Sequence, residues 1–119
     1  MSLRKNRESE EMYLETILLL RKKGGEVHSV DVAAWLGYAK SSVSRGVNLL
    51  REKGYIEIDT SGRITFTAAG LKKAEGVYER HRVLQEALRQ LGADSETAEN
   101  DACRIEHVIS DELFEVLKG

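Results

Sequence analysis

The chain has 119 residues, which is enough for one modest domain or two small lobes. A large enzyme active site is not expected in a chain of this length. A hydrophobic share of 41% beside 32% charged residues is typical of a folded chain and excludes extended disorder. The net charge of -2 by itself argues against nucleic-acid binding, but this total hides an uneven distribution of charge along the chain. Residues 1–73 hold 13 Lys and Arg against 9 Asp and Glu, whereas residues 74–119 hold 5 against 11. This asymmetry predicts a basic lobe for a polyanion and an acidic lobe for cations or self-association.

The chain shows no feature of a secreted or membrane protein. Its single cysteine cannot form an intramolecular disulfide, and no apolar run approaches the roughly 18 residues that span a bilayer. The opening MSLRKNRESEE is charged and lacks the apolar region of a secretory signal, so we expect a frayed arm there. A reducing, cytoplasmic location is the default expectation, with no membrane partner.

In chain order, the apolar spacing of residues 9–23 predicts an amphipathic helix that the following pair of glycines ends. A short helix is expected over residues 30–36, with Ser29 as its N-cap and Gly37 as a left-handed stop. The run KSSVSRG then opens a third helix over residues 40–53. Two helices joined by a turn that contains glycine are typical of a helix-turn-helix.

The segments YIEID and RITFT alternate apolar and polar residues around a Thr-Ser-Gly turn, which predicts a two-stranded hairpin. Helices followed by a hairpin also occur in unrelated small domains, but this order of elements favours a winged helix-turn-helix. Beyond it, we expect a long helix over residues 68–91 capped by Thr67, a helix from Asp94 or Ser95 to about Val108, and a last one after Ser110.

The predicted fold class is therefore mainly α with a small β-hairpin. Residues 1–73 are expected to form a winged helix-turn-helix DNA-binding domain, and residues 74–119 a helical metal-binding and dimerisation domain. The apolar positions of the last three helices exceed what a lobe of this size can bury alone, which predicts a homodimer.

The second helix of a helix-turn-helix enters the major groove with its N-terminal residues at the base edges. Arg45 can read guanine with two hydrogen bonds, Lys40 can contact a phosphate, and hydroxyls can serve either. Helix capping is an equal interpretation for Ser41, and a solvated surface arginine is one for Arg51 and Arg63. The expected DNA-binding residues are Lys40, Ser41, Ser42, Ser44, Arg45, Arg51 and Arg63.

Cys103, Glu106 and His107 stand at i, i+3 and i+4 of a predicted helix, so a thiolate, a carboxylate and an imidazole share one face. Sulfur, oxygen and nitrogen donors together suit a first-row transition metal. A buried apolar cysteine beside a solvated Glu-His pair is the alternative. From this spacing alone a fourth ligand must come from elsewhere in the chain.

These segments resemble a known family. The runs EMYLETILLL at 11–20, ERHRVL at 79–84 and ACRIEHVISDE at 102–112, with the winged helix between the first two, are similar to metal-dependent repressors typified by the diphtheria toxin repressor and the manganese transport regulator. The resemblance covers nearly the whole chain. It implies a DNA-binding regulator and not an enzyme, with double-stranded DNA at a palindromic operator as partner and no small-molecule substrate.

The resemblance implies a primary metal site of Met12, Cys103, Glu106 and His107, as in the iron-responsive branch of the family; the manganese branch has acidic residues at the first two positions. Sulfur ligands favour Fe(II), Co(II) or Ni(II) over Mn(II), and availability in cells favours Fe(II). A second site is implied by Glu15, His81 and Glu99. His81 matches a ligand of both branches and Glu15 one of the manganese branch, but Gln85 replaces a carboxylate and Glu99 a histidine of the iron branch.

Other functions remain as alternatives to a metal-dependent regulator, and one histidine has no assigned role. His28 matches no ligand and is expected on the surface, and the chain ends before the third, barrel-like domain of larger family members. One alternative is a metal-independent or redox-responsive winged-helix regulator with Cys103 as a sensor thiol. A hydrolase using Cys103 and His107 lacks an orienting third group, and a plain interaction module leaves the basic, serine-rich helix without a purpose.

Overall fold

The computed structural model describes the backbone from Ser2 to Gly119 and the side chains from Ser9 onward. The contacts divide the chain into two compact units, residues 9–75 and residues 76–119, and the latter also takes the residues up to Glu8. We call these the N-terminal and C-terminal lobes, and the division falls within one long helix. No helix in the described part of the chain is long and apolar enough to cross a membrane.

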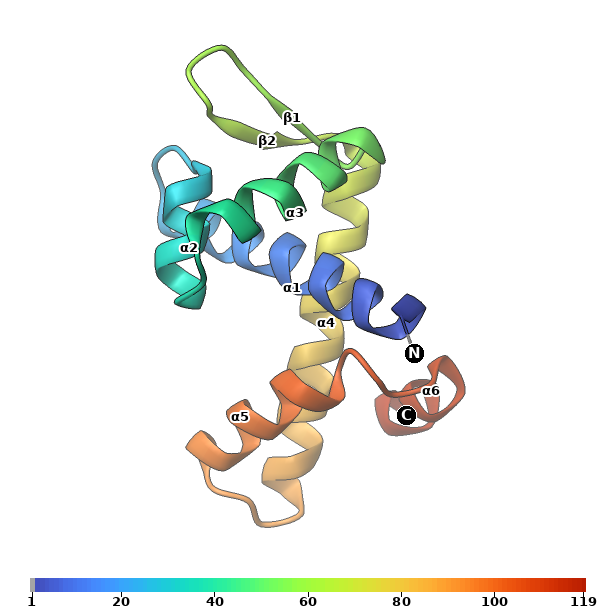
Figure 1. Cartoon of the computed structure of the whole chain (residues 1–119). Helices are drawn as coiled ribbons and strands as arrows, with labels where there is room; N and C mark the ends of the chain where they lie inside the picture. The colour runs from blue at the N-terminus through green and yellow to red at the C-terminus, as the bar shows by residue number, and fades with distance from the viewer. Residues whose placement is uncertain (1) are drawn as a thin grey trace. The chain divides into compact units, whose positions relative to one another are not determined.

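The N-terminal lobe contains a helix-turn-helix followed by a hairpin (Figure 1). Its core consists of apolar side chains from every one of its elements, including Leu14, Ile17, Val32, Val47 and Ile56, which are at most 1% exposed. Burying an aliphatic side chain of this size stabilises the fold by about 1.5–3 kcal/mol. The elements are α1 (Ser2–Lys23), α2 (Ser29–Leu36), α3 (Lys40–Glu52), β1 (Ile56–Ile58) and β2 (Ile64–Phe66).

Three expectations about helix starts are wrong. The first helix begins at Ser2, so the opening segment is helical from there and not a frayed arm. His28, not Ser29, is the N-cap of α2, and its backbone N–H donates to the Asp31 carboxylate at 2.9 Å. Ala39 is the N-cap of α3, without a side-chain bond, which places Ser41 inside the first turn and removes its interpretation as a cap.

The hairpin pairs β1 with β2 in antiparallel register, with Ile56 opposite Phe66 and Ile58 opposite Ile64. The Ile64 N–H donates to the carbonyl of Val27 at 2.8 Å, which fixes the hairpin to the loop before α2. The Asp59 carboxylate accepts from the Ser61 N–H, the Ser61 hydroxyl and the Arg63 N–H at 2.7–2.9 Å. The expected wing is confirmed, and its turn is held by its own side chain.

The long helix α4 (Ala68–Gln90) starts in the N-terminal lobe and continues through the C-terminal lobe. The Thr67 hydroxyl accepts from the Gly70 N–H at 3.1 Å, so Thr67 is the expected cap. A Cβ at Gly70 would overlap the carbonyl oxygen of Tyr55, so only glycine lets α4 pass this close to the backbone just before β1.

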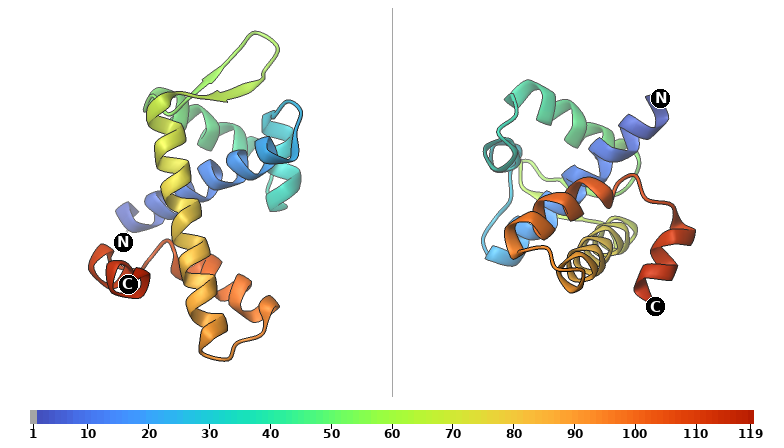
Figure 2. Two further views of the ribbon diagram at one scale, coloured as in Figure 1. Left: turned by 180° about the vertical axis from the view of Figure 1, so that it is seen from behind. Right: turned by 90° about the horizontal axis from the view of Figure 1, so that it is seen from below.

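The C-terminal lobe adds α5 (Ser95–Ile105) and α6 (Asp111–Lys118), capped by Asp94 and Ser110 (Figure 2). Leu84, Ala102, Ile109 and Phe114 form its core. The predicted extension of α5 to Val108 is wrong, because the Val108 N–H bonds to Ile105 in a tightened turn. The residues after Ile105 therefore belong to the α5–α6 turn. The fold class is as predicted: mainly helical, with a two-stranded hairpin.

Candidate metal centre

Glu106 is the centre of the C-terminal lobe's candidate site. It follows the end of α5, keeps a right-handed helical backbone, and its N–H still bonds to the Ala102 carbonyl at 2.9 Å. Its side chain is wholly buried, at 0% exposed. Oε2 lies 3.4 Å from His81 Nδ1 and Oε1 lies 3.3 Å from His107 Nε2. The carboxylate therefore has an imidazole at each oxygen.

Arg80 fixes the turn that carries these side chains. Its Nη1 donates to the Glu106 carbonyl at 3.3 Å, and its Nη2 lies 2.6 Å from the Asp111 carboxylate at the start of α6. A cation at the last carbonyls of a helix is favourable, because that end of the helix carries partial negative charge. Sequence reasoning missed this residue, although it is part of the run ERHRVL.

His81, Cys103 and Glu106 each place one ligand atom so that these atoms lie within 4.8 Å of one another. His81 comes from α4, Cys103 from the last turns of α5 and Glu106 from the turn that follows. Cys103 is exposed, which contrasts with the interpretation of a buried apolar cysteine. The structure thus brings His81 to the Cys103 and Glu106 pair, whereas the sequence assigned it to a separate second site.

The donor set fits a divalent transition metal. It offers a sulfur, two imidazole nitrogens and two carboxylate oxygens, which are the ligand types of Fe(II), Co(II), Ni(II) and Zn(II). A buried carboxylate is costly unless positive charge compensates it. An imidazole supplies that charge only when protonated, and a divalent cation supplies it whatever the protonation state. The residues present therefore fit the group.

The remaining predicted ligands belong to α1 and α5. Met12 and Glu15 are on α1 in the N-terminal lobe; the Met12 sulfur accepts from the Tyr38 hydroxyl at 3.4 Å, and Glu15 is buried. Glu99 is exposed on α5 and is not among the clustered donors of the described residues. Gln85 lines a groove on α4. The ligation of Met12, Glu15 and Glu99 stays a prediction.

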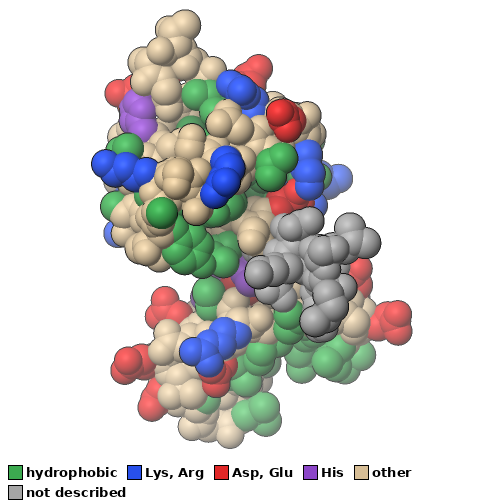
Figure 3. Space-filling model, in the orientation of Figure 1, with side chains coloured by type: hydrophobic (Ala, Val, Ile, Leu, Met, Phe, Trp, Pro, Cys, Tyr) green, Lys and Arg blue, Asp and Glu red, His purple; other side chains and the backbone are tan. Residues whose placement is uncertain are grey.

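The predicted DNA-binding residues all lie at the surface of the N-terminal lobe. Helix α3 turns Val43, Val47 and Leu50 into the core and leaves its serines and Arg45 exposed. Arg63 follows the wing turn, and its backbone N–H is held by Asp59. Figure 3 shows Lys and Arg side chains distributed over one face of this lobe. The exposed set is Lys40, Ser41, Ser42, Ser44, Arg45, Arg51 and Arg63.

Two family models match the chain. Residues 7–62 match the N-terminal DNA-binding domain of iron-dependent repressors, and residues 67–118 match their metal-binding and dimerisation domain. An uncharacterised helix-turn-helix transcriptional regulator of Methanocaldococcus jannaschii is 33% identical over 113 residues, covering 93% of this chain and 90% of that protein. The transcriptional regulator MntR of Escherichia coli is 34% identical over 106 residues, covering 89% of this chain and 68% of that protein.

Among solved structures, a manganese-dependent transcriptional repressor in complex with manganese superposes with a TM-score of 0.83 at 25% identity. The match covers 91% of this chain and 50% of that one, so the present chain spans half of that repressor's length. A winged helix-turn-helix followed by a helical lobe with clustered metal donors defines a metal-dependent DNA-binding transcriptional regulator. The chain belongs to the iron-dependent repressor family, which consists of transcription regulators and not of enzymes.

Proposed function

We propose that this protein is a dimeric repressor that binds a palindromic operator when Fe(II) occupies the centre at Glu106. The observation that carries the proposal is the cluster of His81, Cys103 and Glu106, with the buried carboxylate set between two imidazoles. The division into a DNA-binding domain of residues 1–73 and a metal-binding and dimerisation domain of residues 74–119 is part of the proposal.

The thiolate decides the choice of metal in this proposal. Cys103 is a soft donor, and soft donors bind Fe(II), Co(II) and Ni(II) better than Mn(II). The superposed repressor structure is a manganese-dependent one, and the resemblance implies that manganese-responsive members have an acidic residue where this chain has Cys103. Fe(II) is the favoured ion, and Mn(II), Co(II) and Ni(II) are the alternatives that a titration distinguishes.

The proposed ligands form two sets, and Glu106 lies beside a histidine of each. Met12, Cys103, Glu106 and His107 make the primary set, and Glu15, His81 and Glu99 make the second set. The Glu106 carboxylate supports a role in both sets, because each oxygen has its own imidazole. His107 would then bind the primary ion beside one Glu106 oxygen, and His81 the second ion beside the other. In the second set, Glu106 would take the place of the exposed Glu99.

A bound divalent ion supplies a positive charge and a fixed coordination geometry. In the C-terminal lobe the proposed donors include Glu106 and His107. In the N-terminal lobe they are Met12 and Glu15 on α1, the helix that packs beside α3 (Figures 1 and 2). Ligands drawn from both lobes would restrict their relative orientation. Two recognition helices match half-sites one helical turn apart in only some arrangements, so favouring the matching arrangement raises DNA affinity by population shift.

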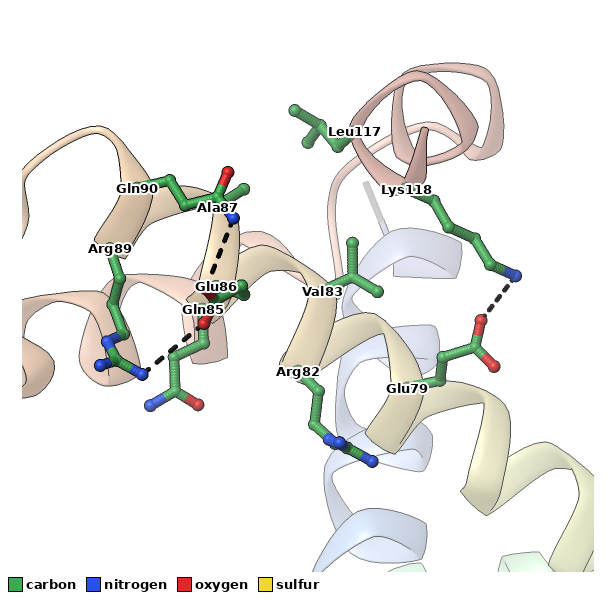
Figure 4. A pocket seen from close by; sticks show the side chains of 10 residues that line it. All are labelled: Glu79, Arg82, Val83, Gln85, Glu86, Ala87, Arg89, Gln90, Leu117 and Lys118. Atoms are coloured by element: carbon green, nitrogen blue, oxygen red, sulfur yellow. Dashed lines mark hydrogen bonds and ion pairs between the residues drawn. The ribbon is translucent and has the colours of Figure 1, made fainter.

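The proposed dimer surface is an open groove between α4 and α6 with a volume of about 940 Å³ (Figure 4). Val83, Ala87 and Leu117 are its apolar lining residues among polar and charged ones, and Lys118 lies 2.7 Å from the Glu79 carboxylate. On the same helix, Val116, Leu113 and Leu117 are 72%, 50% and 40% exposed. A second copy of this lobe, which the matched family model describes as a dimerisation domain, would cover these side chains.

The test is DNA binding by the purified protein with no metal and with Fe(II), Mn(II) or Zn(II), together with light scattering. We expect a dimer at tens of micromolar and specific DNA binding that rises most with Fe(II). Binding that is indifferent to every metal would reject metal control, and a stronger response to Mn(II) than to Fe(II) would reject the choice of ion alone. A salt series on random DNA gives the nonspecific background.

A further inference from the structure

Tyr38 connects a proposed metal ligand to the turn of the helix-turn-helix. Its hydroxyl donates to the Met12 sulfur at 3.4 Å, and both residues belong to the N-terminal lobe. Tyr38 follows Gly37, whose φ of 71° ends α2, and stands two positions before Lys40, the first residue of α3. The partner of Met12 is therefore the chain segment that sets where the recognition helix begins.

The contact restrains the methionine without using up its sulfur. Methionine has three rotatable side-chain bonds, and fixing them costs up to about 2 kcal/mol, so an unrestrained methionine is a poor ligand. A thioether sulfur has two lone pairs, and one can accept a hydrogen bond while the other stays available to a metal. Tyr38 is 45% exposed, so its hydroxyl could otherwise bond to water.

The residue next to Met12 makes a second connection to the same motif. A Cβ at Gly46 in the middle of α3 would overlap the Tyr13 ring, so the tyrosine packs directly on the recognition helix. Burial raises the pKa of Tyr13, Tyr38 raises it further, and Arg45 opposes the shift. Two consecutive residues of α1 therefore contact the helix-turn-helix: Met12 at its turn and Tyr13 at the recognition helix.

We propose that Tyr38 is a positioning residue that holds Met12 for the metal and passes the state of Met12 to the helix-turn-helix turn. The inference rests on the proposed function, because it assigns Met12 to the metal. A displacement of the sulfur on metal binding moves the Tyr38 hydroxyl, and Tyr38 is separated from Lys40 only by Ala39. Coupling then runs within the N-terminal lobe through one hydrogen bond and one packed ring.

The experiment is a double-mutant cycle with Tyr38→Phe and Met12→Leu. Tyr55→Phe is the matched control, because it removes a tyrosine hydroxyl of the same lobe that interacts with Lys73. Co(II) is the probe, since its binding to a thiolate is visible by absorption. For each protein we measure the Co(II) dissociation constant and the gain in operator affinity that Co(II) produces.

We expect Tyr38→Phe to weaken Co(II) binding and to reduce the gain in operator affinity by about three- to tenfold, which is the usual range for a residue along a coupling path. Met12→Leu should reduce the gain at least as much, and adding Tyr38→Phe to it should change nothing more, because the hydroxyl then has no sulfur to hold. Tyr55→Phe should leave both quantities within twofold of the parent.

Three results would overturn the inference. The first is an unchanged gain in Tyr38→Phe, and the second is an additive effect in the double variant. The third is an equal loss of DNA affinity with and without Co(II), which would make Tyr38 a DNA contact. A parent protein whose DNA affinity does not respond to any metal would instead overturn the proposed function, and this inference with it.

Discussion

The wing turn and the turn after α5 each gather polar groups around one carboxylate, in opposite ways. Asp59 is exposed and takes three hydrogen bonds from Ser61 and Arg63, within four residues of itself. Glu106 is fully buried, and its oxygens face His81, which lies on another helix, and His107. The first arrangement is complete within its own loop and holds a shape. The second concentrates metal donors where positive charge is needed, which is the arrangement of a binding site.

The largest effect is expected from Glu106→Gln. The amide keeps the size of the side chain but loses the negative charge, so metal affinity should fall by about a hundredfold or more, and metal-dependent DNA binding with it. The metal-free protein should be no less stable, because a buried neutral amide is cheaper than a buried carboxylate. Metal titration and thermal unfolding without metal measure the two quantities.

Alanine substitutions at two glycines of α4, one in each lobe, allow their effects on stability to be compared within one helix. Gly70→Ala should destabilise the protein by about 1–3 kcal/mol, because the new methyl group meets the Tyr55 carbonyl and backbone cannot yield as a side chain can. Gly76→Ala meets nothing within 4 Å and should stabilise α4 by about 0.5–1 kcal/mol. Denaturant unfolding of both variants measures the difference, and equal effects would contradict the close approach at Gly70.

Periodicity and capping residues determined most of the fold in advance. The helix-turn-helix, the wing and the caps Thr67 and Ser110 depend on neighbours in sequence, and they were predictable for that reason. The position of His81 beside Cys103 was not predictable from spacing, since it depends on how α4 packs on the end of α5. The Met12–Tyr38 contact joins positions 26 apart in sequence and has no local signal.

The site differed from expectation for the same reason. The spacing of Cys103, Glu106 and His107 was interpreted as one helical face, but α5 ends at Ile105 and the last two residues follow in a turn. Arg80 explains why the turn still presents them, because it holds the Glu106 carbonyl and the start of α6 together. A single-sequence pattern finds the donors, whereas the residue that orients them appears only with tertiary contacts.

A smaller effect is expected from Arg80→Gln. Glutamine is shorter than arginine and uncharged, so it cannot join the Glu106 carbonyl to the Asp111 carboxylate, and Glu106 and His107 should lose part of their fixed orientation. We expect metal affinity to fall by about tenfold, the lower end of what supporting residues of a metal site contribute. Tm in the absence of metal serves as the control. A large loss of Tm with no change in metal affinity would show that Arg80 is only a structural link to α6.

The smallest effect is expected at the wing, from Asp59→Asn. The hydrogen bonds from the Ser61 hydroxyl and the Arg63 N–H lower the pKa of Asp59 below its ordinary 3.8; desolvation opposes them, and the Ser61 N–H and the Arg63 charge add to the lowering. A carboxyl group whose pKa is lower in the folded state stabilises that state fully above its unfolded pKa, and the contribution is lost as the pH falls through the folded value. Wild type should therefore be slightly more stable than Asp59→Asn at pH 7, and the difference should begin to shrink near pH 3.8 and disappear once the pH is below the lower, folded pKa. Denaturant unfolding of both proteins at neutral pH and at successive acidic values measures this difference. Metal affinity at pH 7 should be the same in both proteins, because Asp59 serves only its own turn, and a changed metal affinity would show that the two carboxylate turns are not independent.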